Sequence, residues 1–322
     1  MDSESPYSSM VNEFVNWQVK YGIKYANSTE TVKRFAIFKE NFEFVENFNK
    51  GNDTYTVGLD QYSDLTDEEF YSLYGESPNV SNDISSFEVR SNTNTVIFNL
   101  TDDIPKNLDW RDHGAVTDVK DQKLCGACWA FSAVAAVESI WKIKKGFLLT
   151  LSEQQLIDCD SRSHGCDGGH PDQGLRHIVE SDGILEDEDY PYRGYHDEDG
   201  SCDLRDQNAP EVDINSITYV QRLDERQLLR AVAQQPVSVE IANGGKHFRK
   251  YKNGIYRGPC ALHPSHAVTI VGYGEEHGVK YWLYKNSYGT KWGDKGYMKI
   301  IREAGEAAGH CSIALNPVYP TI

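Results

Sequence analysis

Cysteine is missing from the first 124 residues, and all seven cysteines of this 322-residue chain lie beyond them. Long apolar runs are missing as well, since none approaches the roughly 20 residues of a membrane-spanning helix. The N-terminus is polar and lacks the basic segment followed by an apolar one that is typical of a signal peptide. We therefore expect no membrane span, and either a cytosolic protein or one whose targeting segment has been removed and a start methionine added.

Basic side chains are scarce relative to acidic ones: 32 Lys and Arg stand against 49 Asp and Glu, which gives a net charge of −17. Residues 1–103 account for −11 of this charge. Nucleic acids and anionic membranes bind basic patches. The composition therefore argues against a nucleic-acid or membrane partner. We further expect a monomer with no cofactor and no metal.

Four Asn-x-Ser/Thr sequons occur in the first third of the chain and none in the part that carries the cysteines; they begin at Asn27, Asn52, Asn79 and Asn99. Such sequons often occur by chance, so they are weak support for a secreted glycoprotein. Their separation from the cysteines indicates two regions of different character.

Two amphipathic helices are predicted near the N-terminus, where apolar residues recur at steps of three and four over residues 7–25 and 28–50. Ser28 or Thr29 can cap the second helix, and Gly51 can end it. The second helix also carries a regularly spaced set of residues: Glu30, Arg34, Phe38, Asn41, Val45 and Asn49. This set resembles the Glu-Arg-Phe-Asn-Ile-Asn pattern in the propeptides of papain-like cysteine proteases, with valine in the place of isoleucine.

A second propeptide motif of that family, Gly-x-Asn-x-Phe-x-Asp, resembles residues 58–64, which read Gly-Leu-Asp-Gln-Tyr-Ser-Asp. Asp60 replaces the asparagine and Tyr62 the phenylalanine. Asp60 adds a charge that can alter the pH at which the propeptide dissociates. The polar residues 76–103 show little periodicity, so we predict an extended or mobile linker there.

The segment Ile104–Arg111 resembles the N-terminus of a mature papain-type enzyme, and the resemblance continues to Tyr319-Pro320. It implies an α+β, papain-like fold with an inhibitory propeptide over residues 1–103 and a mature peptidase domain over 104–322.

Within residues 104–322 the predicted helices precede the predicted strands. Ser152 and Gln155 form a capping pattern for a helix that ends at Cys159. Short β-branched or aromatic runs predict strands in the second half, at 236–241, 266–273, 281–285 and 297–301. We expect a mainly helical subdomain at about 104–213, a mainly β subdomain at about 214–322, and a substrate cleft between them.

Cys128 lies where an alanine-rich run with helical spacing begins. The unpaired N–H groups and the positive end of a helix dipole favour a thiolate at such a position. On residue type alone, a core or disulfide cysteine is the simpler interpretation. The stretch 125–129, Cys-Gly-Ala-Cys-Trp, however, matches the Cys-Gly-[Ser/Ala]-Cys-[Trp/Tyr] signature of papain-like enzymes.

The resemblance implies a catalytic role for four residues. Cys128 matches the nucleophile, His266 the general base, Asn286 the residue that orients the histidine, and Gln122 the side chain of the oxyanion hole. A structural histidine and a surface glutamine would be the ordinary interpretations of two of these positions outside this context.

Six other cysteines permit fifteen disulfide pairings, so the sequence alone does not give the connectivity. The resemblance implies the pairs Cys125–Cys166, Cys159–Cys202 and Cys260–Cys311, which leave Cys128 free. The alternative is a zinc site built from Cys125, Cys128, Cys159 and Cys166 with His164 or His170. It would use Cys128 as a ligand and leave the histidine and asparagine unexplained.

Substrate-binding positions also follow from the resemblance: Gly168, Gly169, His170, Pro171, Glu240, Pro264, Ala267, Asn316 and Trp292. Glu240 is an acid within an apolar strand. It is either directed into the specificity pocket, where it could pair with a basic substrate side chain, or turned outward by a shift of one residue in the strand. We predict that the pocket prefers a polar or basic residue at P2 to phenylalanine.

Tyr288 departs from the family, which usually has tryptophan after Asn-Ser at this place to cover the histidine–asparagine hydrogen bond. Trp292, the second aromatic residue of that cluster, is retained. We predict that Tyr288 still shields the pair and that activity persists.

Together these features predict the zymogen of a papain-like cysteine endopeptidase, similar to plant enzymes, that cleaves proteins and peptides and is inhibited by its own propeptide. The acidic propeptide indicates activation at low pH. We expect a secreted, vacuolar or lysosomal location. The alternative is a catalytically silent storage or binding protein with the same fold, which would not need all four catalytic residues.

Overall fold

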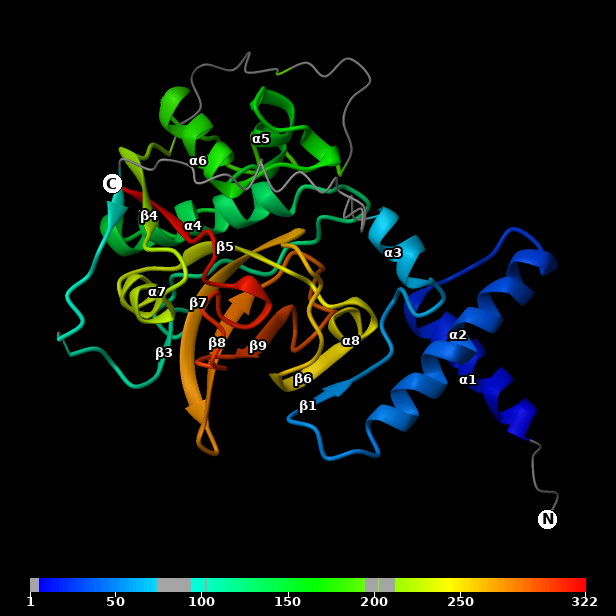
Figure 1. Cartoon of the computed structure of the whole chain (residues 1–322). Helices are drawn as coiled ribbons and strands as arrows, with labels where there is room; N and C mark the ends of the chain where they lie inside the picture. The colour runs from blue at the N-terminus through cyan, green and yellow to red at the C-terminus, as the bar shows by residue number, and fades with distance from the viewer. Residues whose placement is uncertain (1–5, 74–93, 102, 195–201, 203–211) are drawn as a thin grey trace.

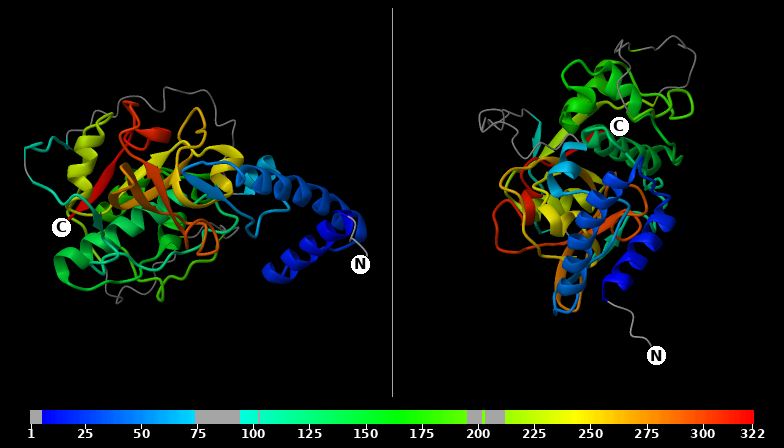
Figure 2. Two further views of the ribbon diagram at one scale, coloured as in Figure 1. Left: turned by 90° about the horizontal axis from the view of Figure 1, so that it is seen from below. Right: turned by 90° about the vertical axis from the view of Figure 1, so that its right-hand side faces the viewer.

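The computed structural model describes residues 6–73, 94–101, 103–194, 202 and 212–322. Two helices, α1 (Pro6–Tyr21) and α2 (Ser28–Phe48), cross each other and extend to one side of the molecule (Figures 1 and 2). They pack through a small aromatic core of Phe14, Trp17 and Phe38. Neither these nor the other described helices combine the length and apolar character that crossing a membrane requires.

The N-cap of α2 differs from the predicted one. Asn27, rather than Ser28 or Thr29, is the cap, and its side chain accepts a hydrogen bond from the Glu30 N–H at 2.9 Å. Asn, Ser and Thr all cap helices, so the choice among three consecutive residues depends on backbone geometry.

A third helix, α3 (Asp67–Leu73), follows β1 (Tyr55–Val57) in the N-terminal region. Thr66 and Glu69 form a full capping box, because each side chain bonds the backbone N–H of the other at 3.1 Å. The predicted linker at 76–103 falls partly outside the described residues, as does Asn79. Its described part contains β2 (Thr95–Val96).

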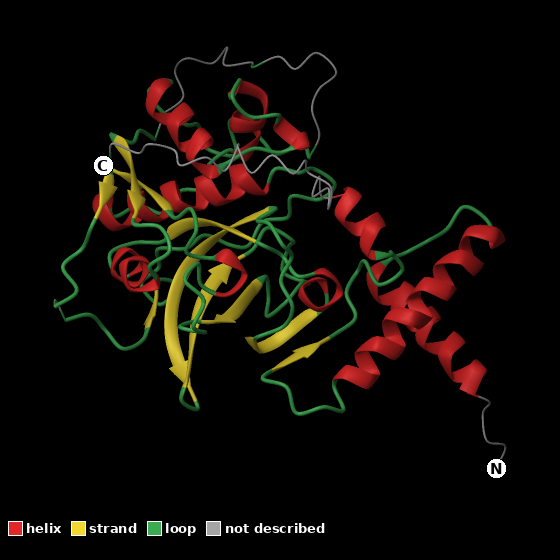
Figure 3. Cartoon of the chain, viewed as in Figure 1, coloured by secondary structure: helices red, strands yellow, loops and turns green. Residues whose placement is uncertain are grey.

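Helices dominate the first half of the C-terminal region (Figure 3): α4 (Cys128–Lys145), α5 (Glu153–Cys159), η2 (Gly165–Asp167) and α6 (Pro171–Glu180). The central helix α4 is buried along its first 13 residues and ends at Gly146, whose φ of 87° suits glycine. Ser152 caps α5 as predicted and accepts from the Gln155 N–H at 3.0 Å. The Gln155 side chain accepts from the Leu185 N–H instead of completing the box.

A mixed sheet forms most of the second half, with the strand order β1-β6-β9-β8-β7-β5-β10-β4-β2. The predicted strands correspond to β5 (Val237–Ile241), β7 (His266–Glu276), β8 (Val279–Lys285) and β9 (Tyr297–Ile301). The sequence pattern missed β3 (Leu108–Asp109), β4 (Ser216–Val220), β6 (Tyr251–Tyr256) and β10 (Val318–Thr321). Three short helices accompany the sheet: α7 (Glu225–Val232), α8 (Gly245–Arg249) and η3 (His310–Ser312).

The N-terminal region supplies the strands at both ends of this sheet order. At one end β1 pairs antiparallel with β6, and at the other end β2 pairs parallel with β4. Figure 1 shows β1 beside β6, far from the β4 end of the sheet. Residues 94–96 are therefore docked on the sheet, in contrast to a free linker.

Candidate active site

Cys128 is the first residue of α4 and is 7% exposed. The other six cysteines form three disulfides: Cys125–Cys166, Cys159–Cys202 and Cys260–Cys311. This confirms the pairing that the family resemblance implied. The zinc alternative loses three of its four sulfur ligands to these disulfides, so it has no support.

His266 begins β7 and lies beside Asn286, the residue after β8. The Asn286 Oδ1 accepts a hydrogen bond from His266 Nε2 at 2.7 Å. Both side chains are buried, at 2% and 3% exposure. A buried amide oxygen that takes one ring N–H fixes both the tautomer and the ring plane, so the neutral imidazole carries its proton on Nε2 and its lone pair on Nδ1.

The helix α4 packs against β7 close to these residues. Ser132, one helical turn after Cys128, donates its hydroxyl to the Val268 carbonyl at 2.8 Å. Val268 lies two residues after His266 on β7. This contact fixes the helix that carries Cys128 to the strand that carries His266.

Gln122 is fully buried between the two halves of the C-terminal region. Its Nε2 donates to the Cys125 carbonyl at 2.8 Å, and its Oε1 accepts from the Ser287 hydroxyl. The Tyr192 hydroxyl donates to the backbone carbonyl of Gln122 at 2.5 Å, and burial raises the pKa of the Tyr192 hydroxyl. These bonds hold the amide next to the loop that leads to Cys128.

Tyr288 lies on the His266–Asn286 pair, with its ring centroid 4.8 Å from that of the imidazole. It is fully buried, and its hydroxyl is 3.4 Å from His266 Nδ1. Trp292 packs edge-on against Tyr288 at 5.6 Å and donates its indole N–H to the Arg249 carbonyl. The tyrosine thus occupies the place predicted for a shield of the pair.

A buried ionic network lies next to the site and reaches it through Lys285, the neighbour of Asn286. Lys120 Nζ lies 3.2 Å from Glu138 Oε1 and 2.7 Å from Glu153 Oε1. Lys285, adjacent to Asn286, donates to Thr117, whose hydroxyl donates to Glu138. Burial raises the pKa of Glu153 to about 7, whereas the two lysines keep the pKa of Glu138 below its usual value despite burial.

Glu240 faces inward, as the first of the two predicted orientations requires. Its Oε1 lies 2.5 Å from His170 Nδ1, and its Oε2 accepts from Asn316 Nδ2 at 2.7 Å. The Glu240 side chain is 12% exposed and that of His170 is 32% exposed. Three predicted pocket residues are therefore brought together, and both carboxylate oxygens already have partners.

The remaining predicted pocket positions lie on α6, on β7 and in the loops that precede them. Ala267 pairs with Glu240 across β5 and β7, and Pro171 is the first residue of α6. Gly169 has no room for a side chain, because a Cβ there would lie 2.8 Å from Trp129 Cδ2 and 2.7 Å from Ser163 Oγ. Gly168 has a φ of 117°, which favours glycine. Pro264 is half-buried, two residues before His266.

Comparison with known proteins identifies the family. Residues 104–321 match the model of the papain family cysteine proteases, and residues 14–70 match the cathepsin propeptide inhibitor domain. The chain belongs to the papain family of cysteine proteases. It has the papain-like fold of that family, together with the family's inhibitory propeptide.

Plant members of the papain family are similar over nearly the whole chain. A senescence-specific cysteine protease of Arabidopsis thaliana is 41% identical over 97% of this chain and 90% of its own length. Fruit bromelain of Ananas comosus is 38% identical over 99% of this chain and 88% of its own length. The crystal structure of the ragweed pollen allergen Amb a 11, a cysteine protease in its proform, has a TM-score of 0.88 and 35% identity, with 99% and 95% of the two chains covered. The chain is accordingly the zymogen of a cysteine endopeptidase, and the silent storage or binding alternative has no support among these relatives.

The propeptide of this papain-family zymogen buries two cations of the peptidase domain. Arg249 donates to the carbonyls of Leu65 and Thr66, and its guanidinium lies 3.0 Å from Asp67. Lys250 Nζ lies 3.1 Å from Asp60 Oδ1, and its side chain is fully buried. Burial lowers the pKa of Lys250 to about 8.

Phe70 of the propeptide was not predicted as a site residue. It is fully buried and meets Tyr288 edge-on, with ring centroids 5.7 Å apart. The Thr66-x-x-Glu69 pattern could have revealed the helix that carries it. The propeptide therefore packs directly on the aromatic shield of the His266–Asn286 pair.

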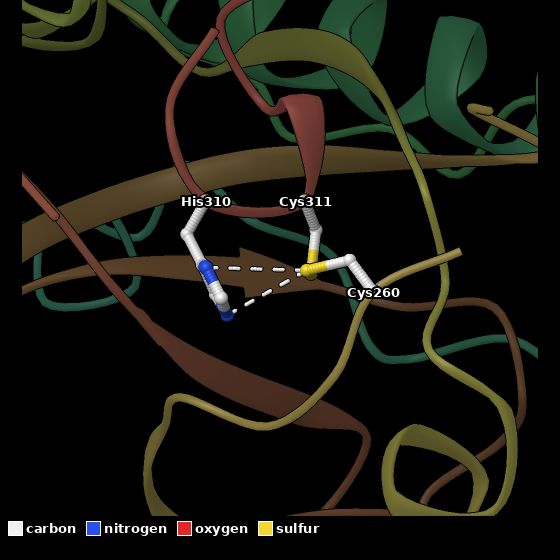
Figure 4. Close-up of side chains that lie close together, drawn as sticks. All are labelled: Cys260, His310 and Cys311. Atoms are coloured by element: carbon white, nitrogen blue, oxygen red, sulfur yellow. Dashed lines mark hydrogen bonds between the residues drawn. A yellow bond between two sulfur atoms is a disulfide. The ribbon is translucent and has the colours of Figure 1, made fainter. Parts of the chain in front are cut away.

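Within the described residues, a group of three possible metal ligands, Cys260, His310 and Cys311, gathers at η3 (Figure 4). Both sulfurs belong to one disulfide, and His310 Nε2 lies 3.0 Å from the Gly258 carbonyl. Thiolates bind metals, whereas disulfide sulfurs are poor ligands. The group is explained as a disulfide with a neighbouring histidine.

Proposed function

We propose that Cys128 is the nucleophile of this endopeptidase, that His266 is its general base and acid, and that Asn286 orients the imidazole. The 2.7 Å hydrogen bond between Asn286 Oδ1 and His266 Nε2 is the observation that carries the assignment. The pairing of all other cysteines supports it, because only Cys128 keeps a thiol.

The reaction begins with transfer of the thiol proton from Cys128 to His266, and the sulfur attacks the peptide carbonyl carbon. The imidazolium gives its proton to the leaving amine as the C–N bond breaks, which leaves a thioester. His266 then deprotonates a water molecule that attacks the thioester and releases the acid and the thiol. Sulfur and imidazole titrate as a coupled pair, so the pH profile belongs to both.

Gln122 is proposed to stabilise the oxyanion together with the Cys128 backbone N–H. Its Nε2 has two N–H groups, of which one is used by the Cys125 carbonyl. Loss of one oxyanion donor typically costs about 3 kcal/mol of transition-state stabilisation. The bond to Ser287 holds the amide in one orientation, with the N–H groups away from that side.

Processing near Ile104 is proposed to separate an inhibitory propeptide, residues 1–103, from the mature domain, residues 104–322. The mature domain would contain a mainly helical part, about 104–213, and a mainly β part, about 214–322. Mild acidification should yield a fragment that starts near Ile104 together with peptidase activity that thiol reagents block. An acid-treated chain that stays intact, or a processed chain without such activity, would refute this proposal.

The specificity pocket is proposed to prefer basic residues at P2, because Glu240 places a carboxylate between His170 and Asn316. His170 already binds the Glu240 carboxylate and would compete with a basic P2 side chain for it, which limits the preference for basic residues. His170→Phe should therefore increase the ratio of kcat/KM for Arg-Arg over Phe-Arg substrates, and Glu240→Gln should decrease it. Unchanged or reversed ratios would contradict the assignment.

We further propose a monomeric enzyme that is secreted or delivered to a vacuole or lysosome. The three disulfides support passage through the secretory pathway, because its compartments are oxidising. The described sequon residues Asn27, Asn52 and Asn99 are exposed, which supports glycosylation. Mass spectrometry before and after glycosidase treatment, with size-exclusion chromatography and light scattering, tests these points.

A further inference from the structure

Residues 94–101 of the propeptide lie along the β4 edge of the peptidase sheet. Thr95 is paired with Tyr219 and Val96 with Val220, in parallel. The Tyr219 N–H donates to the Asn94 carbonyl at 3.1 Å. An exposed strand edge binds extended peptides in this manner.

A side chain of α7 extends this pairing beyond the strand. The Gln227 Oε1 accepts from the Phe98 N–H at 2.6 Å, and its Nε2 donates to the Phe98 carbonyl at 3.1 Å. The side-chain amide of Gln227 thus hydrogen-bonds both the N–H and the carbonyl of Phe98, as the backbone of a neighbouring strand would. Gln227 is 4% exposed, and Arg230 adds a bond to the Leu100 carbonyl at 2.5 Å.

The side chains of the docked segment alternate between the core and the solvent. Val96 and Phe98 pack against the main hydrophobic core, whereas Ile97 is 73% exposed. The peptidase domain therefore holds this segment through an extended backbone and through apolar side chains at alternate positions. Four hydrogen bonds go to backbone groups of the segment, at the Asn94 carbonyl, both groups of Phe98 and the Leu100 carbonyl, so they would suit other sequences as well.

We propose that β4 and α7 form a strand-binding exosite of the mature enzyme, which holds an extended segment of a protein substrate after residues 94–101 have left. The inference rests on the proposed cleavage near Ile104. That cleavage exposes the β4 edge and removes both partners of the Gln227 amide. A new strand restores these bonds, and unpaired strand edges associate readily.

The direct test is binding of a fluorescent peptide with the sequence of residues 94–101 to acid-processed enzyme whose Cys128 is blocked by an epoxide inhibitor. Fluorescence anisotropy should show saturable binding. Gln227→Ala should weaken it about tenfold, since two hydrogen bonds are lost. Gln234→Ala, an exposed glutamine two residues after α7, is the matched control and should have no effect. A peptide with serine in place of Phe98 should also bind more weakly.

A kinetic test separates this proposal from the catalytic one. Gln227→Ala should raise KM for a denatured protein substrate and leave kcat/KM for a dipeptide substrate unchanged. Loss of dipeptide cleavage in the unaltered enzyme would refute the catalytic assignment instead. The exosite is overturned if the peptide does not bind, if Gln227→Ala binds it equally well, if the mature chain begins before Asn94, or if the β4 edge is filled by a second enzyme molecule.

Discussion

Replacing Asp60 with asparagine should weaken inhibition by the propeptide, and the effect should be larger at acidic than at neutral pH. Asp60 is the charged residue that departs from the family motif, and its carboxylate lies 3.1 Å from the fully buried Lys250. Removing one partner of a buried ion pair typically costs about 3–5 kcal/mol. That cost applies only while Lys250 keeps its proton.

Lys250 can avoid the penalty of an unpaired buried charge by losing its proton. The free energy of this deprotonation follows from the difference between the pH and the Lys250 pKa of about 8. At pH 7 deprotonation costs about 1.4 kcal/mol, so the variant should lose at most about a factor of ten in propeptide docking. At pH 5 it costs about 4 kcal/mol, and the loss can reach a factor of about 1,000. In the Asp60→Asn variant, the Lys250 ammonium therefore stays buried and charged without a carboxylate only at acidic pH.

The assay is the rate at which an epoxide inhibitor labels Cys128 in the zymogen, divided by the rate in mature enzyme at the same pH. This ratio reports the fraction of open zymogen and cancels the ionisation of the thiol. Glu46→Gln, an exposed change of the same charge on α2, is the control and should leave the ratio unchanged. An Asp60→Asn effect that is equal at both pH values, or larger at pH 7, would refute the reasoning.

Three further predictions concern the site and its support. Tyr288→Ala should lower kcat at least about tenfold by exposing the histidine bond, whereas Tyr288→Trp should retain activity; steady-state kinetics check both. Glu138→Gln should lower the free energy of unfolding by about 3–5 kcal/mol in urea titrations, because Lys120 loses a buried partner. Glu153 has a pKa raised by burial to about 7, so the folded state holds its proton more tightly and stability should fall as pH rises from about 4.5 to 7. Glu153→Gln should flatten this part of the stability profile.

The catalytic set could be predicted because it is tied to strong local signals. Cys128 begins a helix with a clear apolar pattern, and His266 and Asn286 lie at the ends of runs that read as strands. The disulfide pairing was available only through the family resemblance, since six cysteines permit fifteen pairings.

Contacts between segments that are distant in the chain could not be predicted from the sequence. The two-residue strand β2 has no periodicity to detect, and its partner β4 is more than 100 residues away. The orientation of Glu240 remained open because a shift of one residue reverses a strand's faces. The cap at Asn27 was missed because the two following residues have equal capping ability.

Labelling of Cys128 tests the central claim most directly. After acid processing, an epoxide-type thiol inhibitor should bind one per chain, on the peptide that contains Cys128, and abolish activity in proportion to labelling. Cys128→Ser should take up none, with the other six cysteines protected in disulfides. Full activity in a chain labelled at Cys128, or activity in the Cys128→Ser enzyme, would contradict the account.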